Sequence, residues 1–307
     1  MFIPIGECIH IINKEVRAAI DNRDADFIRK LAIKQVDCGA KMLDLNIGPQ
    51  KKAGPEIMDW IVNAVQEVVD VPLSLDTTNA EAIEAGLKVC KRKPIINSTN
   101  ADPKRMSVLF PLAAKYDVGI ITLTLRATGL PVSADERAQI LVEDLLPAAE
   151  AAGLPMQNIY VDPLAMTVNG TQEHAPEVLQ TALVVKSIME PPLHMTCGLS
   201  NVSNGAPADV RKVLNRVYLV MLMGAGMDTA ILDPLDKELM DTIRILENRD
   251  DSTPAGKAYL ALYDACAAGD EFDTSILDMS DAKQAELAKT VAILNNKMIY
   301  AHNYLQL

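Results

Sequence analysis

The chain has 307 residues, of which 49% are hydrophobic and 23% charged, a composition typical of a soluble globular protein with a sizeable core. Its net charge of −12 argues against nucleic-acid binding, because the chain offers no broad basic face for phosphates. No apolar run approaches the roughly 18 residues of a membrane span, and the start MFIPIGE is unlike a signal peptide, so we expect a cytoplasmic protein without membrane attachment.

The cysteines argue against a metal or iron–sulfur centre. There are five, and they show no CxxC motif and no paired spacing. An odd number of scattered cysteines fits reduced thiols in a reducing compartment. We therefore expect no bound metal, and mostly inert thiols at Cys8, Cys38, Cys90, Cys197 and Cys266.

Eight short apolar runs have the length of buried strands. Helical periods separate them; in GPEIMDWIVNAVQEVV, for example, Ile57, Ile61 and Val65 fall on one face. Some helices stop at a glycine, as at Gly39 and Gly153, where a left-handed cap suits glycine. The predicted strands are Phe2–Glu7, Lys41–Gly48, Val71–Thr77, Lys93–Thr99, Val118–Leu125, Asn158–Leu164, Leu193–Ser200 and Met227–Asp233.

Alternation of strands and helices predicts a parallel sheet. Eight such units with strands buried on both faces favour an α/β fold of the (β/α)₈ barrel type over an open sheet. An open sheet would also favour a phosphate loop after the first strand, whereas this chain has GECIH there. We assign residues 1–249 to the barrel.

Residues 250–307 are predicted to form a helical C-terminal extension. The segment ENRDDSTPAG is polar and rich in turn residues, so it reads as a connection. Ser280 is the predicted N-cap of a final helix with an apolar stripe. That stripe consists of Leu287, Val291, Leu294 and Met298. We expect it to dock on the barrel or a second subunit; a partner protein is the alternative.

Acidic and amide residues gather at the predicted strand ends. Barrel active sites lie at the carboxyl ends of the strands, so these side chains should surround one mouth. Carboxylates accept hydrogen bonds and amides both donate and accept, which suits the edge of a pterin ring, whereas phosphate would require cations or a glycine nest. The residues concerned are Asp44, Asn46, Asp76, Asn79, Asn97, Asn100, Asp162 and Asn201.

Five motifs carry a specific resemblance. DLNIG, SLDTTN, INSTN, YVDPL and GLSNVSNG, in this order and spacing, resemble those of pterin-binding methyltransferases. The chain is most similar to methyltetrahydrofolate–corrinoid methyltransferases, and also resembles the folate domain of cobalamin-dependent methionine synthase. The resemblance covers about residues 2–248 and leaves the extension outside.

The resemblance implies roles for individual residues. Asp76, Asn97 and Asp162 match the residues that hold the pterin ring edge, and Asn201 matches the catalytic asparagine that bonds pterin N5. Arg211 falls where the family places an arginine in a mobile loop close to the folate. The remaining implied residues are Gly198 and Ser200 in the folate site, with Asp44 and Asn46 in support.

One motif departs from the family pattern. The first strand commonly ends in GERIN, whereas this chain has GECIH, so Cys8 and His10 replace an arginine and an asparagine. The contacts of that arginine are thereby in doubt. For Cys8 we favour a packing or loop role over a reactive thiol, and for His10 a loop role over catalysis.

The resemblance implies tetrahydrofolate or 5-methyltetrahydrofolate as substrate and cobalamin from a separate corrinoid protein. The chain has no DxHxxG motif for a cobalamin domain of its own, and no zinc-ligand cluster to activate homocysteine. A homodimer is also implied.

The direction of transfer is open at this point. The extension favours the tetrahydrofolate-methylating component of an O- or N-demethylation system. The alternatives are methylation of a corrinoid iron–sulfur protein in acetyl-CoA synthesis, dihydropteroate synthase, and a non-catalytic folate-binding module. For dihydropteroate synthase, the STRPG-type loop after the second strand is missing and GPQKKAGPE stands in its place.

Overall fold

A computed structural model describes residues 1–306. Eight parallel strands pair in the order β7-β6-β5-β4-β3-β2-β1-β8. A parallel bridge between Gly198 and Ile231 brings the ends of β7 and β8 together, so the sheet is a nearly closed barrel. The predicted (β/α)₈ fold is confirmed. The strands are β1 (Ile3–His10), β2 (Met42–Asn46), β3 (Leu73–Asp76), β4 (Ile95–Asn100), β5 (Gly119–Leu123), β6 (Ile159–Asp162), β7 (His194–Met195) and β8 (Thr229–Leu232).

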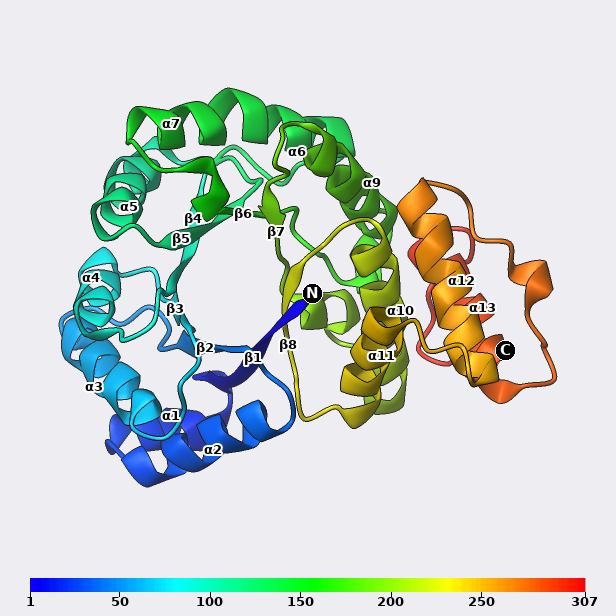
Figure 1. The fold of residues 1–307 in the computed structure, drawn as a ribbon, viewed down its shortest axis with the longest axis horizontal. Coiled ribbons are helices and arrows are strands. Elements are labelled where there is room, and N and C mark those ends of the chain that lie inside the picture. The colour runs from blue at the N-terminus through cyan, green and yellow to red at the C-terminus, as the bar shows by residue number, and fades with distance from the viewer. Residues whose placement is uncertain (307) are drawn as a thin grey trace.

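Helices surround the strands as an outer ring (Figure 1). Gly39 and Gly153 have φ values of 110° and 72° and follow α2 and α7, as the sequence predicts. The barrel helices are α1 (Lys14–Asp21), α2 (Ala25–Asp37), α3 (Gly54–Gln66), α4 (Ala80–Val89), α5 (Pro103–Tyr116), α6 (Ala134–Ile140), α7 (Leu146–Ala151), α8 (Val168–Thr171), α9 (His174–Ser187), α10 (Ala208–Gly224) and α11 (Lys237–Asn248). Short turns of other types are η1 (Leu141–Leu145), η2 (Met156–Asn158) and η3 (Leu199–Ser203).

The extension packs on the outside of the barrel, against α10 and α11 (Figure 1). Leu287, Val291 and Leu294 of the predicted stripe are buried in the same apolar core as the barrel helices. The first of the two docking alternatives therefore holds: the stripe docks on the chain's own barrel. The elements of the extension are α12 (Pro254–Ala268), η4 (Thr274–Ile276), α13 (Ala282–Leu294) and η5 (Tyr304–Gln306).

Two details of the extension differ from the sequence-based expectation. The N-cap of α13 is Asp281, whose carboxylate accepts from the backbone N–H of Gln284 at 3.0 Å. The prediction of Ser280 as the N-cap was therefore wrong by one residue. Ser280 instead donates its hydroxyl to Asp278. The helix ends at Leu294, so Met298 lies beyond it.

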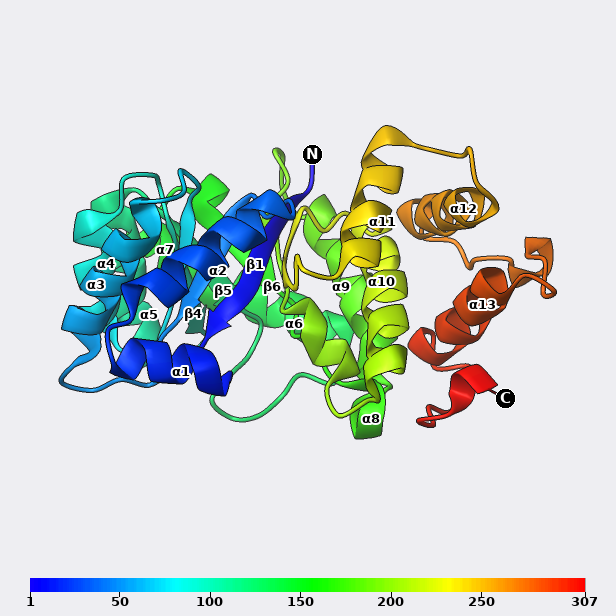
Figure 2. The same ribbon diagram turned by 90° about the horizontal axis from the view of Figure 1, so that it is seen from below.

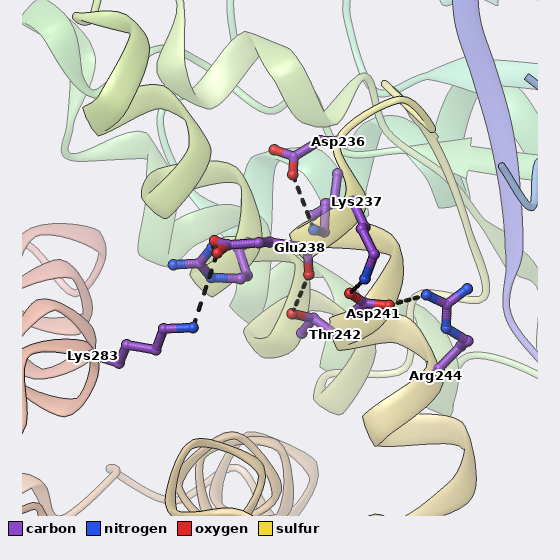
Figure 3. Close-up of polar contacts among 9 residues, drawn as sticks. Asp236, Lys237, Glu238, Asp241, Thr242, Arg244 and Lys283 are labelled. Atoms are coloured by element: carbon purple, nitrogen blue, oxygen red, sulfur yellow. Dashed lines mark hydrogen bonds and ion pairs between the residues drawn. The ribbon is translucent and has the colours of Figure 1, made fainter.

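Charged side chains also connect the extension to the barrel. Glu238 of α11 accepts from the largely buried Arg216 of α10 and lies 3.9 Å from the Lys283 ammonium of α13 (Figure 3). The Lys283 and Glu238 side chains are 63% and 57% exposed, so that pair contributes little stability. Apolar burial is therefore the main attachment.

Helix α10 comes unusually close to the extension. Every residue from 213 to 224 of this helix is buried, because the barrel covers one side and α12 and α13 the other. A β-carbon built on Gly224 would lie 2.5 Å from the Tyr263 carbonyl oxygen and 2.8 Å from Cys266 Cβ. The absence of a side chain at Gly224 sets the distance between α10 and α12.

We expect Gly224→Ala to destabilise the protein by about 1–3 kcal/mol, because α12 must move away from α10. In an exposed helix the same change would stabilise by roughly 0.5–1 kcal/mol. Urea unfolding measures the difference, and Lys212→Ala at an exposed position of α10 is the control. A stabilised Gly224→Ala variant would contradict the close packing.

Candidate functional site

The inward faces of the strands change from apolar to polar toward one end of the barrel. Alternate residues of a strand share a face, so Met42 lies beneath Asp44, and Ile95 beneath Asn97. Ile5, Met42, Ile95 and Ile121 form a small apolar cluster separate from the main core. They make an apolar floor, and the polar residues stand above it at the carboxyl ends.

A cavity of about 370 Å³ opens at this mouth, within the usual size range of ligand sites. Seven of the nine site residues predicted from the sequence line it, contributed by β2, β3, β4 and β6 and by the segment after β7. These seven are Asp44, Asn46, Asp76, Asn97, Asp162, Gly198 and Asn201.

Asp44 and Asp76 lie on the adjacent strands β2 and β3, and each carboxylate accepts hydrogen bonds from other side chains. Asp44 accepts from Ser74 Oγ at 2.6 Å and from Asn97 Nδ2 at 3.1 Å, and Asp76 accepts from Asn46 Nδ2. Burial raises the pKa of both carboxyls, and the negative charge of Asp76 raises that of Asp44 further. These hydrogen bonds hold the side chains of Asp44, Asn46 and Asn97 in place along the wall of the cavity.

Asp162 is a further buried acid of the cavity, at the end of β6. It is 8% exposed, and its Oδ1 accepts from the Leu164 amide at 2.7 Å. Burial raises the pKa of this carboxyl from 3.8 to about 7. A carboxylate so poorly solvated gains much from a ligand that brings N–H donors.

Asn201 stands at the rim. It lies in η3, and its side chain is exposed and lines the cavity. A β-carbon on Gly198 would lie 3.0 Å from Asn201 Nδ2, so glycine leaves this amide room to turn. A ligand entering the mouth can therefore reach the Asn201 amide.

Glu7 was missed by the sequence analysis. It lines the cavity from β1, and its Oε1 accepts from Ser200 Oγ at 2.6 Å. Burial, with Asp233 and Asp44 nearby, raises the pKa of this carboxyl. The signal was present in GECIH, since Glu7 continues the inward face of Ile3 and Ile5. Ser200 does not line the cavity itself, but it contacts the cavity residue Glu7.

Arg211 lies apart from the cavity lining. The expectation of a loop position is corrected: Arg211 is exposed in the first turn of α10. Its positive charge partly opposes the burial that raises the pKa of Glu7.

The cavity is acidic overall. Its lining within residues 1–306 contains the carboxyls of Glu7, Asp44, Asp76 and Asp162, and neither lysine nor arginine. Such a surface favours an uncharged ligand rich in N–H donors and disfavours phosphate.

Residues 13–233 match the family described as "Pterin binding enzyme". The chain belongs to this pterin-binding family. It is 31% identical over 245 residues to a methylcorrinoid:tetrahydrofolate methyltransferase of Eubacterium limosum, covering 78% of this chain and 88% of that protein. It is also 25% and 26% identical over 228 residues to methionine synthases of Mycobacterium leprae and Mycobacterium tuberculosis, covering 72% of this chain but 19% of each of those proteins. The predicted family resemblance is confirmed.

Two kinds of feature are absent from residues 1–306. No helix there is both long and apolar enough to cross a membrane. In the same part of the chain, no three His, Cys, Asp or Glu side chains are grouped so that they could hold a metal ion.

The two residues that replace the family's pattern in GECIH differ in their environment. Cys8 Sγ donates to Asp233 Oδ1 at 3.3 Å, and burial together with this carboxylate strongly raises the pKa of the thiol. His10 lines the cavity, burial lowers its pKa, and its Nδ1 accepts from the Ile12 amide at 3.3 Å. The environment of Cys8 agrees with a packing role. His10 is the last residue of β1, so its expected loop position is corrected.

We expect Cys8 to resist alkylation in the folded protein, because its thiolate is disfavoured by burial and by Asp233. Iodoacetamide at pH 8 followed by peptide mass spectrometry measures the labelled fraction. The urea-unfolded protein is the control and should label fully. Rapid labelling of Cys8 in the folded state would show a reactive thiol instead.

Proposed function

We propose that this protein transfers a methyl group between N5 of a tetrahydrofolate and the cobalt of a separate corrinoid protein. Membership of the pterin-binding family and the similarity to a methylcorrinoid:tetrahydrofolate methyltransferase support this activity. The observation that carries it is the cavity of carboxylates and amides at the barrel mouth.

In this proposal the pterin edge meets Asp76, Asn97 and Asp162. The two carboxylates accept the ring N–H and amino donors, while the Asn97 amide oxygen remains an acceptor because its nitrogen donates to Asp44. Such charge-assisted bonds are stronger than neutral ones, and a buried carboxylate without them is costly. These contacts place the ring and leave N5 toward the rim.

Asn201 acts at N5. Breaking or forming the N5–methyl bond changes the charge on that nitrogen, and an amide can accept from a protonated N5 or donate to a free one. A hydrogen bond that strengthens as the charge changes lowers the barrier. Water takes up the proton that N5 loses when tetrahydrofolate is methylated, and supplies it in the reverse direction. Fixed positioning of the ring supplies much of the remaining rate.

We propose that the methyl group moves from the corrinoid to tetrahydrofolate in a demethylation system. The relative from Eubacterium limosum is named a methylcorrinoid:tetrahydrofolate methyltransferase, which supports this direction. Methylation of a corrinoid iron–sulfur protein is the reverse alternative. Dihydropteroate synthase must hold a diphosphate, which the acidic cavity lining disfavours. We also propose that the protein is a homodimer and is located in the cytoplasm.

The test mixes the purified protein with tetrahydrofolate and methylcobalamin under anaerobic conditions and follows the cobalt spectrum; the reverse mixture contains methyltetrahydrofolate and cob(I)alamin. Conversion in either mixture supports methyl transfer, and the faster one gives the direction preferred with free cobalamin. Repetition with candidate methylated corrinoid proteins tests for a strict protein partner. Tight folate binding without conversion under all these conditions would favour a binding module.

Folate affinity should weaken as the pH falls through about 7. Asp162 binds ring donors as a carboxylate, and its raised pKa of about 7 means that protonation already competes with binding near neutrality. Below this pH the dissociation constant should rise by up to about tenfold per pH unit for this one group. Calorimetric titration from pH 8 to pH 5 measures it, and a flat profile would contradict the role of Asp162.

A further inference from the structure

The C-terminal extension runs along the outside of the barrel toward the end that carries the mouth. β1 runs from the N-terminus toward the end where α1 and α8 lie, and the last turn of the chain lies on that side (Figure 2). Helix α12, by contrast, lies near the opposite end (Figure 2). The extension therefore crosses the outside of the barrel from its closed end to the end that carries the cavity.

One buried side chain joins the extension to a loop of the site. Gln172 is 8% exposed and follows α8 in the segment between β6 and α9. Its amide nitrogen donates to the carbonyl oxygens of Ile293 at 2.9 Å and Met298 at 2.7 Å, and its amide oxygen accepts from the Tyr300 backbone at 2.7 Å. Three backbone groups of the extension are thus satisfied by one residue of the barrel.

The segment that ends at Gln172 begins next to Asp162, the acid proposed to bind the pterin edge. It starts after Asp162, and Leu164, which donates its amide to Asp162, lines the cavity. The backbone between these points therefore runs from the cavity wall to the extension within ten residues, from 162 to 172. An anchor at Gln172 limits the positions that this backbone can take.

The same segment supports the loop that carries Asn201. Thr167 Oγ1 donates to the Asn204 carbonyl oxygen at 2.7 Å, and the Asn204 amide donates to the Asn201 carbonyl oxygen at 3.1 Å. The Thr171 hydroxyl donates to the Thr167 carbonyl oxygen at 2.6 Å, next to Gln172. A continuous series of contacts thus connects Gln172 with η3.

We propose that Gln172 is a positioning residue through which the C-terminal extension holds the β6 and β7 loops in the shape that binds folate. This inference rests on the proposed function and assigns a task to the extension. Gln172 itself does not line the cavity, so it acts through Asp162 and Asn201. Small displacements of such groups have large effects on binding and rate.

The test compares two buried glutamines. Gln172→Met keeps the length of the side chain but loses its three bonds. Gln284→Met is the matched control, because Gln284 is 9% exposed and accepts from the Asp278 amide within the extension. Thr167→Val and Thr167→Ser remove and retain the hydroxyl that supports η3. Folate affinity by calorimetry and kcat and KM for methyl transfer are measured at a temperature where every variant is folded.

We expect Gln172→Met and Thr167→Val to weaken folate affinity by about tenfold or more, while Gln284→Met and Thr167→Ser stay near the unmodified protein. Should Gln172→Met not fold, Gln172→Asn, which withdraws the amide by one methylene, replaces it. Unchanged folate affinity in the Gln172 variants, or an equal loss in Gln284→Met, would overturn the proposal. Since affinity is measured directly, a protein that binds folate but transfers no methyl would refute the activity alone.

Discussion

Asp162→Asn is expected to abolish useful folate binding and, at the same time, to stabilise the ligand-free protein at pH 8. The pKa of this buried carboxyl lies at about 7, against 3.8 in an unperturbed state. Between these values the folded protein holds a proton that the unfolded chain has lost, so stability falls as the pH rises from about 4 to 7. At about 1.4 kcal/mol per pH unit, the cost in stability above pH 7 is about 4 kcal/mol, and we expect asparagine to recover about 2–4 kcal/mol of it.

The loss of binding has a separate cause. Asparagine can still accept from the Leu164 amide through its oxygen, but it has no charge and offers N–H groups to a ligand that is itself a donor. We expect the folate dissociation constant to rise by about a hundredfold or more.

Urea unfolding at pH 8 and at pH 4, with calorimetry for folate, separates the two effects of Asp162→Asn. The gain in stability should be present at pH 8 and nearly absent at pH 4. Asp251→Asn, at an exposed aspartate, is the control and should change neither quantity. A variant that loses stability at pH 8 would contradict the raised pKa of Asp162. A variant that binds folate normally would refute its proposed position at the ring edge.

Asn201→Ala should lower kcat for methyl transfer by about a hundredfold, with a smaller change in folate affinity. Removal of one hydrogen-bond donor that acts on developing charge has effects of this size in other enzymes. An alanine removes none of the proposed ring contacts of Asp76, Asn97 and Asp162, so we expect folate affinity to change less than kcat.

Single-turnover rates under anaerobic conditions measure the Asn201→Ala effect. Asn204→Ala provides a control, because Asn204 lies in the same loop, is exposed, and uses its backbone groups in the contacts described above. Equal losses in both variants would indicate damage to the loop. An unchanged rate in Asn201→Ala would remove the asparagine from the mechanism.

Sequence reasoning reached the barrel and most of the cavity for a clear physical reason. Strand direction in a parallel barrel sends every carboxyl end to the same mouth, so polar residues at strand ends must meet. Asp76, Asn97, Asp162 and Asn201 were found in this way, and all four line the cavity. Glu7 is not among the predicted residues, although its place in β1 brings it to the same mouth.

The extension was harder to predict. Helix α12 reads PAGKAYLALYDACAA, in which small residues occur on every side, so no single apolar stripe marks it. The course of the chain after α13 depends on Gln172, which is more than 120 residues away in the sequence. Contacts between such distant backbone and side-chain groups leave no periodic pattern to read.

The burial of α10 on both sides has a consequence for how the molecule comes apart. If the extension detached alone, residues 213 to 224 would present their outer apolar surface to water, so partial detachment is unfavourable. Residues 1–249 and 250–307 should therefore melt in one cooperative transition, with α10 amides among the slowest to exchange with deuterium. The boundary between residues 249 and 250 would then separate the barrel from its helical extension without separating two units of unfolding.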